Sequence, residues 1–193
     1  MKRVNLSILL VSLLFVGCGS VNTTAPTTTD RVEDSSEVLK NDNKDILNAL
    51  NLARSVSRDC HDGKGIVPPA KPLTWNSELY ASAYEHSSDM AQSNTFSHLG
   101  SGTESDITAS NNGKGKSYFY DRIISNGYGN YSALGENIAG GQQTLDEVMK
   151  AWLASPSHCA NIMNSNFEEV GVAVIVEEDS DFGIYWTQNF GSK

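Results

Sequence analysis

Two histidines and one glutamate are the residues of this chain whose types and settings could do chemistry: His98, Glu136 and His158. Glu136 directly follows Gly135, and His158 lies in the first turn after Pro156, so both stand beside residues that turn or expose the backbone. Two imidazoles and a carboxylate suit either a divalent metal ion or acid–base chemistry. The same side chains also suit hydrogen bonds that clip loops to a core, and the spacing alone leaves both interpretations open.

No familiar catalytic signature accompanies these residues. The sequence contains no H-E-x-x-H zinc motif, no G-x-S-x-G nucleophile turn and no C-x-x-C pair. A reaction therefore cannot be assigned from a short motif.

The composition predicts one globular domain with a tail. The chain has 193 residues, of which 39% are hydrophobic and 8% aromatic, which is enough for one packed core. It carries 14 lysines and arginines against 23 aspartates and glutamates, for a net charge of −9. Because phosphate contacts need concentrated positive charge, this balance excludes nucleic acid as a partner.

The amino terminus has the features of an export signal. A basic start precedes an apolar run from Ile8 to Val16 that is too short to span a membrane. Leu14–Cys18 then resembles a bacterial lipobox. Residues 1–17 are therefore predicted to be a signal peptide, and Cys18 to carry lipid that anchors the exported protein to a membrane of the cell envelope. The alternative is an ordinary signal peptide, with Cys18 free or removed.

Residues 18–44 are predicted to be the lipidated cysteine and a flexible tether. Most of this segment is polar, low in complexity and poor in large apolar residues. Such a sequence buries too little apolar surface to order itself. The globular domain is expected over residues 45–193.

Hydrophobic periodicity predicts several helices and one β-hairpin in this domain. The second helix carries His86 on its apolar stripe, which favours a packed or hydrogen-bonded histidine. The first is expected to bury Val56, and no exposed apolar helix stands out. The predicted helices are Asp45–Arg58, Ser77–Ser93, Ser117–Ser125, one that Thr144 opens in a capping box with Glu147, and one that Ser155 caps before Pro156; the hairpin strands are residues 170–177 and 184–190.

Five ordered motifs resemble the CAP superfamily of cysteine-rich secretory, antigen 5 and pathogenesis-related proteins, also known as the SCP domain. The resemblance runs from about Asp45 to Phe190 and is nearest to the bacterial branch. It implies an α+β fold, a three-layer α-β-α sandwich with a small central antiparallel sheet. The matching segments are Phe96–His98, Gly135–Ala139, Trp152–Met163, Gly171–Ala173 and Tyr185–Gly191.

The resemblance also implies a large cleft whose histidines and glutamates can bind a divalent cation, often Zn²⁺. His98 and Glu136 match the family's first histidine and the glutamate of its G-E-N motif. Ser155 and Tyr185 stand where eukaryotic members have a second glutamate and a second histidine. The bacterial S-P-x-H pattern suggests that His158 takes over as the second histidine. The expected metal ligands are therefore His98, Glu136 and His158, with the alternative that Glu136 orients an imidazole from behind.

The two cysteines of the predicted domain are expected to pair. An exported domain meets an oxidising compartment, which favours a disulfide between Cys60 and Cys159. Two separate buried thiols are the alternative.

Three functions from different classes fit the sequence. The first is an exported, anchored binding or interaction module, with an unknown ligand or protein partner in the cleft. The second is a metal-assisted hydrolase that uses His98, Glu136 and His158. The third is a lipid or sterol carrier, an activity of some CAP proteins. The binding module requires the least of the sequence and is favoured.

Overall fold

The computed structural model describes residues 42–193, so the predicted signal peptide, Cys18 and most of the predicted tether lie outside the described residues. The elements of the described part, in chain order, are α1 (Asn43–Arg54), β1 (Arg58–Asp59), β2 (Ile66–Val67), β3 (Thr74–Trp75), α2 (Ser77–Ser93), α3 (Ile107–Asn112), α4 (Phe119–Ser125), β4 (Ala133–Gly140), α5 (Leu145–Ala154), α6 (Pro156–Met163), β5 (Glu169–Val176) and β6 (Ile184–Ser192).

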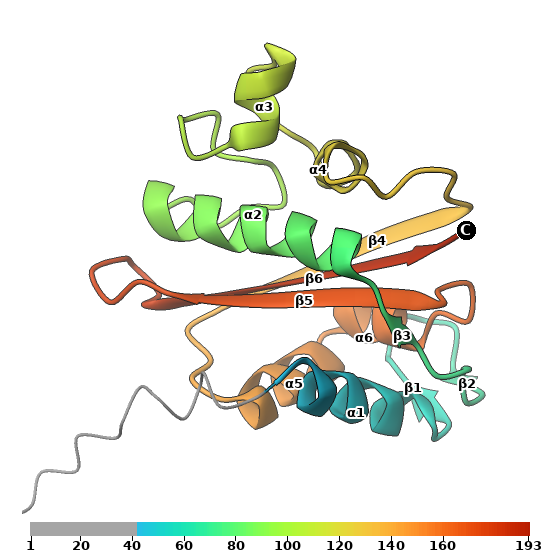
Figure 1. The fold of residues 1–193 in the computed structure, drawn as a ribbon. Helices are drawn as coiled ribbons and strands as arrows, with labels where there is room; N and C mark the ends of the chain where they lie inside the picture. Colours follow the sequence, from blue (N-terminus) through green and yellow to red (C-terminus); the bar gives the residue numbers. More distant parts are fainter. Residues whose placement is uncertain (1–41) are drawn as a thin grey trace, which may run out of the picture. The chain divides into compact units, whose positions relative to one another are not determined.

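The domain has three layers (Figure 1). α2, α3 and α4 lie on one face of the sheet, and α1, α5 and α6 lie on the other. The strand order is β3-β5-β6-β4, with antiparallel pairing of β5 and β4 to the central strand β6 and a short parallel pairing of β3 to β5. The predicted α-β-α sandwich and the predicted hairpin, which is β5–β6, are confirmed.

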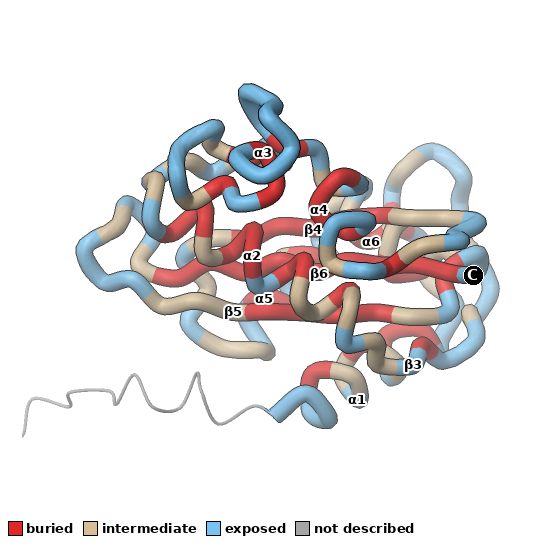
Figure 2. The backbone as a smooth tube through the Cα atoms, turned by 45° about the horizontal axis from the view of Figure 1, so that its top comes forward, coloured by how far each residue is buried: buried red, intermediate tan, exposed pale blue. Residues whose placement is uncertain are grey.

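The main hydrophobic core fills the space between the sheet and the α1–α5–α6 layer. Leu50, Val148, Trp152, Trp186 and Phe190 are all at most 1% exposed there. The rings of the two tryptophans meet edge to face, 6.5 Å apart. Burying a large apolar side chain contributes about 1.5–3 kcal/mol. Figure 2 shows the buried backbone running along the strands, between the two helical layers.

The second helix has the predicted bounds because both of its ends are fixed locally. The side chain of Asn76 accepts hydrogen bonds from the backbone N–H groups of Glu78 and Leu79, at 2.9 and 3.0 Å. Asn94 ends the helix in the left-handed conformation, with φ of 57°.

The predicted end of the first helix at Arg58, and the burial of Val56, are wrong. α1 stops at Arg54, whose fully buried guanidinium donates to four backbone carbonyls on neighbouring segments. The chain then turns away, which leaves Val56 49% exposed and puts Arg58 in β1.

The predicted helix caps are correct in position but not in every bond. Thr144 Oγ1 accepts from the N–H of Glu147 at 3.2 Å, as expected. The Glu147 carboxylate, however, accepts from the N–H of Gln143. Ser155 is the N-cap residue of α6 but makes no capping hydrogen bond with its side chain.

The predicted Cys60–Cys159 disulfide is present. The two Cα atoms lie 5.4 Å apart although the residues are 99 positions apart in the sequence. The bond ties the loop between β1 and β2 to α6 and therefore fixes the residue that follows His158.

Candidate functional site

His98 and Glu136 meet at one edge of the sheet. His98 lies in the loop after α2, and Glu136 lies on β4. The Nδ1 atom of His98 is 2.9 Å from Oε1 of Glu136. The His98 side chain is 54% exposed, whereas that of Glu136 is 2% exposed. The carboxylate thus holds the imidazole from inside the protein.

A buried arginine holds the other oxygen of this carboxylate. Arg122 on α4 donates from Nη2 to Oε2 of Glu136 at 2.9 Å and to the backbone carbonyl of His98 at 3.1 Å. Its Nη1 donates to the carbonyl and hydroxyl oxygens of Ser117, at 3.2 and 3.1 Å. Arg122 therefore fixes Glu136 and the main chain of His98 at once.

The pKa of Glu136 lies below its ordinary value. Burial alone would raise the pKa of this carboxyl, but the charges of His86 and Arg122 and the hydrogen bonds from His98 and Arg122 outweigh it. Because His86 is uncharged near neutral pH, Arg122 supplies the positive charge that remains there. Glu136 is therefore an anion at neutral pH.

His86 lies beneath the His98 loop as a buried, neutral residue. Its Nε2 is 2.9 Å from the carbonyl oxygen of Ser97 and 4.0 Å from Oε1 of Glu136. Burial lowers the pKa of His86 to about 4. The interpretation of His86 as a packed, hydrogen-bonded histidine agrees with this setting. His86 thus holds the carbonyl of Ser97, and Arg122 holds the carbonyl of His98.

These contacts set the tautomer of His98. An ionised carboxylate only accepts hydrogen bonds, so Nδ1 carries the proton that Glu136 receives. In the neutral ring, Nε2 is then the nitrogen with a free lone pair, on a half-exposed side chain. A carboxylate behind an imidazole is the usual arrangement for orienting a histidine toward a ligand.

His158 lies on α6. Its pKa lies below the ordinary value because of burial and, second, because of the charge of His98. Asn137 donates to its backbone carbonyl at 3.2 Å, and Asn161 donates to the carbonyl of Glu136 at 3.1 Å. The G-E-N and S-P-x-H segments thus hold each other in place.

The structure therefore joins His98 to Glu136 directly and holds α6, which carries His158, against the strand of Glu136. In residues 42–193, no group of three His, Cys, Asp or Glu side chains stands where it could hold one metal ion. Both oxygens of Glu136 already accept hydrogen bonds, which leaves the imidazole nitrogens of the two histidines as the groups that could bind a ligand.

Tyr185, which stands where eukaryotic members have a second histidine, is fully buried. Its hydroxyl donates to Asn94 at 3.3 Å.

Sequence reasoning missed Arg122. It stands between Asp121 and Ile123 in a short helix, where a basic residue usually faces solvent. Its complete burial follows from the approach of β4 and of the loop after α2. A possible signal was the buried acid of the G-E-N motif, because a buried carboxylate needs a partner.

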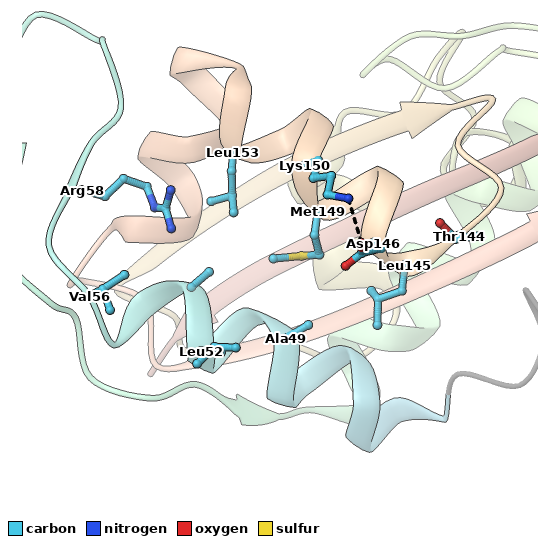
Figure 3. A pocket seen from close by; sticks show the side chains of 11 residues that line it. Ala49, Leu52, Val56, Arg58, Thr144, Leu145, Asp146, Met149, Lys150 and Leu153 are labelled. Atoms are coloured by element: carbon cyan, nitrogen blue, oxygen red, sulfur yellow. Dashed lines mark hydrogen bonds and ion pairs between the residues drawn. The ribbon is translucent and has the colours of Figure 1, made fainter.

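A hollow lies between α1 and α5, away from His98 (Figure 3). This groove has a volume of about 730 Å³. Leu52, Val56, Leu145, Met149 and Leu153 give it apolar walls, and an ion pair between Lys150 and Asp146 lies on its rim. Leu52 is 72% exposed, so the expectation that no helix exposes an apolar face is wrong for α1.

The fold and the His/Glu edge define a CAP-type domain, and the chain belongs to the cysteine-rich secretory protein (CAP) family, which it matches over residues 47–190. It is 37% identical over 123 residues to the uncharacterized protein YkwD of Bacillus subtilis, across 64% of this chain and 40% of YkwD. It is 29% identical over 118 residues to the uncharacterized membrane protein YlbC of the same species, across 61% of this chain and 28% of YlbC.

Two solved structures share the fold. One is an extracellular protein containing an SCP domain from Bacillus anthracis, with 27% identity and a TM-score of 0.57 over 78% of this chain and 40% of that chain. The other is an outer surface protein from Borrelia burgdorferi, with 20% identity and a TM-score of 0.55 over 79% of this chain and 96% of that chain. For the two Bacillus subtilis relatives, the match to this chain covers less than half of their own length. None of the described helices is long and apolar enough to cross a membrane.

Proposed function

We propose that the protein is an exported, envelope-anchored binding module whose ligand contacts His98 and His158. The observation that carries this is the buried Arg122–Glu136 pair behind a half-exposed imidazole. Burying two charges costs several kcal/mol in solvation, and a loop could be clipped by neutral groups instead. The buried Arg122–Glu136 ion pair is explained if ligand binding requires the His98 ring to be held in one orientation.

A divalent cation such as Zn²⁺ is the ligand that best suits the imidazole nitrogens of His98 and His158. His98 offers Nε2, His158 on α6 offers a second imidazole, and imidazole nitrogen is a common zinc ligand. Two protein donors leave coordination positions for water or for a group of a partner. Glu136 acts in this proposal as the carboxylate that orients His98, the alternative that the sequence left open.

Metal titration of the purified protein tests this proposal. Isothermal titration with Zn²⁺ should show binding that His98→Ala and His158→Ala each weaken by at least about tenfold, since each removes one of two protein ligands. Glu136→Gln should weaken it less than either histidine change, because it removes only the carboxylate that orients His98. Binding should also weaken as pH falls, because protons compete with the metal ion for the imidazole nitrogens.

His61 provides the matched control, because its side chain is 81% exposed in the loop after β1. His61→Ala should bind Zn²⁺ like the unaltered protein. The metal proposal fails if His98→Ala and His158→Ala both retain full affinity. Elemental analysis of protein purified without added metal then gives an independent check.

Export is supported by the relatives. The Bacillus anthracis structure is of an extracellular protein, and the Borrelia protein is named for the outer surface. Together with the signal-like amino terminus, they favour a position outside the cytoplasm. The lipid on Cys18 is part of the same proposal.

Lipid binding is a second candidate, favoured by the groove between α1 and α5. Its volume of about 730 Å³ and apolar walls suit an acyl chain. Leu52→Asp should weaken binding of a fluorescent fatty acid by roughly tenfold. Ile66→Asp is the matched control, because Ile66 is 74% exposed on β2 and is not among the groove residues. Equal affinity of both variants for the probe contradicts this candidate.

A further inference from the structure

One edge of the sheet keeps backbone groups unpaired. On one side, the whole length of β5 pairs with β6. On its other side, only the first two residues of β5 are paired, with β3. The N–H of Asn76 donates to the carbonyl of Val170 at 2.9 Å, so the backbone of Val170 faces away from β6. Because strand groups alternate every two residues, those of Val172, Val174 and Val176 face the same side. Val172 is only 1% exposed, whereas Val174 and Val176 are partly exposed, so the last two are the positions open to a partner. Within residues 42–193 no strand covers that side (Figure 1).

A row of aromatic rings follows this edge on the α2 side. Trp75 on β3 and Tyr80 on α2 have ring centroids 5.8 Å apart, and Tyr80 and Tyr84 follow at 6.3 Å. The backbone of α2 at Tyr80 packs so closely on β5 that a side chain at Gly171 has no room. Tyr84 is 50% exposed. An added strand would place every second side chain against these rings.

The far end of the edge is acidic. β5 runs into a turn that begins with Glu177, Glu178 and Asp179, all of them exposed. From residue 169 to residue 192 the sequence contains no lysine or arginine. A strand that carries basic residues at this end is therefore favoured by charge, and an acidic strand is repelled.

A second copy of this chain fits the edge poorly. Antiparallel pairing about Val174 would carry the acidic turn of each copy to the β3 end of the other. There it would meet the short strand β3 and the exposed carboxylate of Glu168. Like charges at close range oppose such pairing, as does the net charge of −9 on each copy.

We propose that the open edge of β5 binds an extended segment of a partner protein as an additional strand, with basic residues beside Glu177 and Glu178. Backbone hydrogen bonds to Val174 and Val176 give the affinity, and the aromatic row and the acidic turn give the selectivity. This surface is separate from the His98 site, because β5 and β4 lie on opposite sides of the central strand β6. It does not depend on the proposed metal.

Binding of designed peptides to the purified protein tests this proposal. The first probe alternates valine and threonine and has two lysines at its amino end; the second has two glutamates there instead. The lysine peptide should bind at least about fivefold more tightly, and 1 M salt should reduce the difference. Amide NMR shifts should centre on Val174 and Val176.

Val174→Pro removes one edge N–H that faces away from β6, and proline is tolerated at such edge positions. This variant should bind the lysine peptide at least about tenfold more weakly. Val174→Thr keeps the N–H and the branched side chain, so it should stay within about twofold. Thermal melts of both variants check that the fold persists; if Val174→Pro unfolds, Tyr84→Ala should show a weakening of about threefold or more instead.

Several outcomes would overturn the proposal. They are the absence of binding by the lysine peptide at millimolar concentration, equal affinity for the two peptides, and shifts centred away from β5. Sedimentation that shows a dimer lost on Val174→Pro would assign the edge to a second copy. A failure here leaves the Zn²⁺ titration unaffected, since the two surfaces share no residue.

Discussion

Arg122→Met is the sharpest test of the reasoning about the site. The change keeps much of the side-chain volume but removes the guanidinium, which makes four hydrogen bonds in a fully buried position. Glu136 then remains as a buried carboxylate without its positive partner. Breaking a buried ion pair from one side typically costs about 3–5 kcal/mol. At about 2–4 °C per kcal/mol for a domain of this size, the melting temperature should fall by roughly 6–20 °C.

The double variant Arg122→Met/Glu136→Gln separates lost charge pairing from lost packing. Without the carboxylate, no unpaired buried charge remains, so the double variant should recover a large part of the stability lost by Arg122→Met. Urea unfolding at pH 7 measures both free energies of unfolding. A loss below about 1 kcal/mol for Arg122→Met, or a double variant less stable than the single one, would refute the account of Arg122 as the charge partner of Glu136.

Three further changes have defined outcomes. Between pH 6.5 and 4, His86 should lower the free energy of unfolding by about 3 kcal/mol, because folded His86 has a pKa of about 4 whereas the unfolded residue takes up a proton near 6.5. Urea unfolding at several pH values should show that His86→Gln lacks this part of the pH dependence. Replacing Cys60 and Cys159 by alanine should cost about 2–5 kcal/mol, because the bond closes a long loop, and a melting temperature unchanged within about 2 °C contradicts this. Cys18→Ser should leave uncleaved precursor or release the protein into solution, as fractionation and mass spectrometry would show; an unaltered protein found wholly soluble without detergent excludes the anchor.

The sequence predicted elements well where one local pattern settles the outcome. Asn76 and Asn94 mark both ends of α2, and the β-branched runs of β5 and β6 identify the hairpin. β4 was not predicted, because Ala-Leu-Gly-Glu-Asn-Ile-Ala-Gly has little intrinsic strand preference. It becomes a strand by pairing with β6 along its entire length. Gly135 also suits it, because the ring of Phe167 occupies the place of a side chain there.

The site shows the same limit more clearly. The family resemblance pointed to His98, Glu136 and His158, but no local pattern reveals that Arg122 is buried or that His86 is neutral. Both properties arise only when α2, α4, β4 and the loop after α2 come together. The motif thus identified the chemistry-bearing groups, whereas the partners that set their charge and direction depend on tertiary structure.

The two helical layers of the sandwich differ in polarity, and this difference explains where buried polar groups such as Arg122 and His86 can be accommodated. Mainly apolar residues fill the contact between the α1–α5–α6 layer and the sheet, including Trp152 on α5 and Trp186 on β6. On the other side, α2 buries several polar groups, namely Ser82, Glu85, His86, Ser87 and Asp89. A buried polar network is stable only if nearly every member finds a partner, and it adds less net free energy than apolar packing. The apolar layer therefore supplies the excess stability that allows the opposite layer to hold Arg122, Glu136 and His86 in fixed positions. On this argument, conservative core changes on α1 and α5 should lower stability without altering Zn²⁺ affinity, whereas changes in the α2 network should alter both.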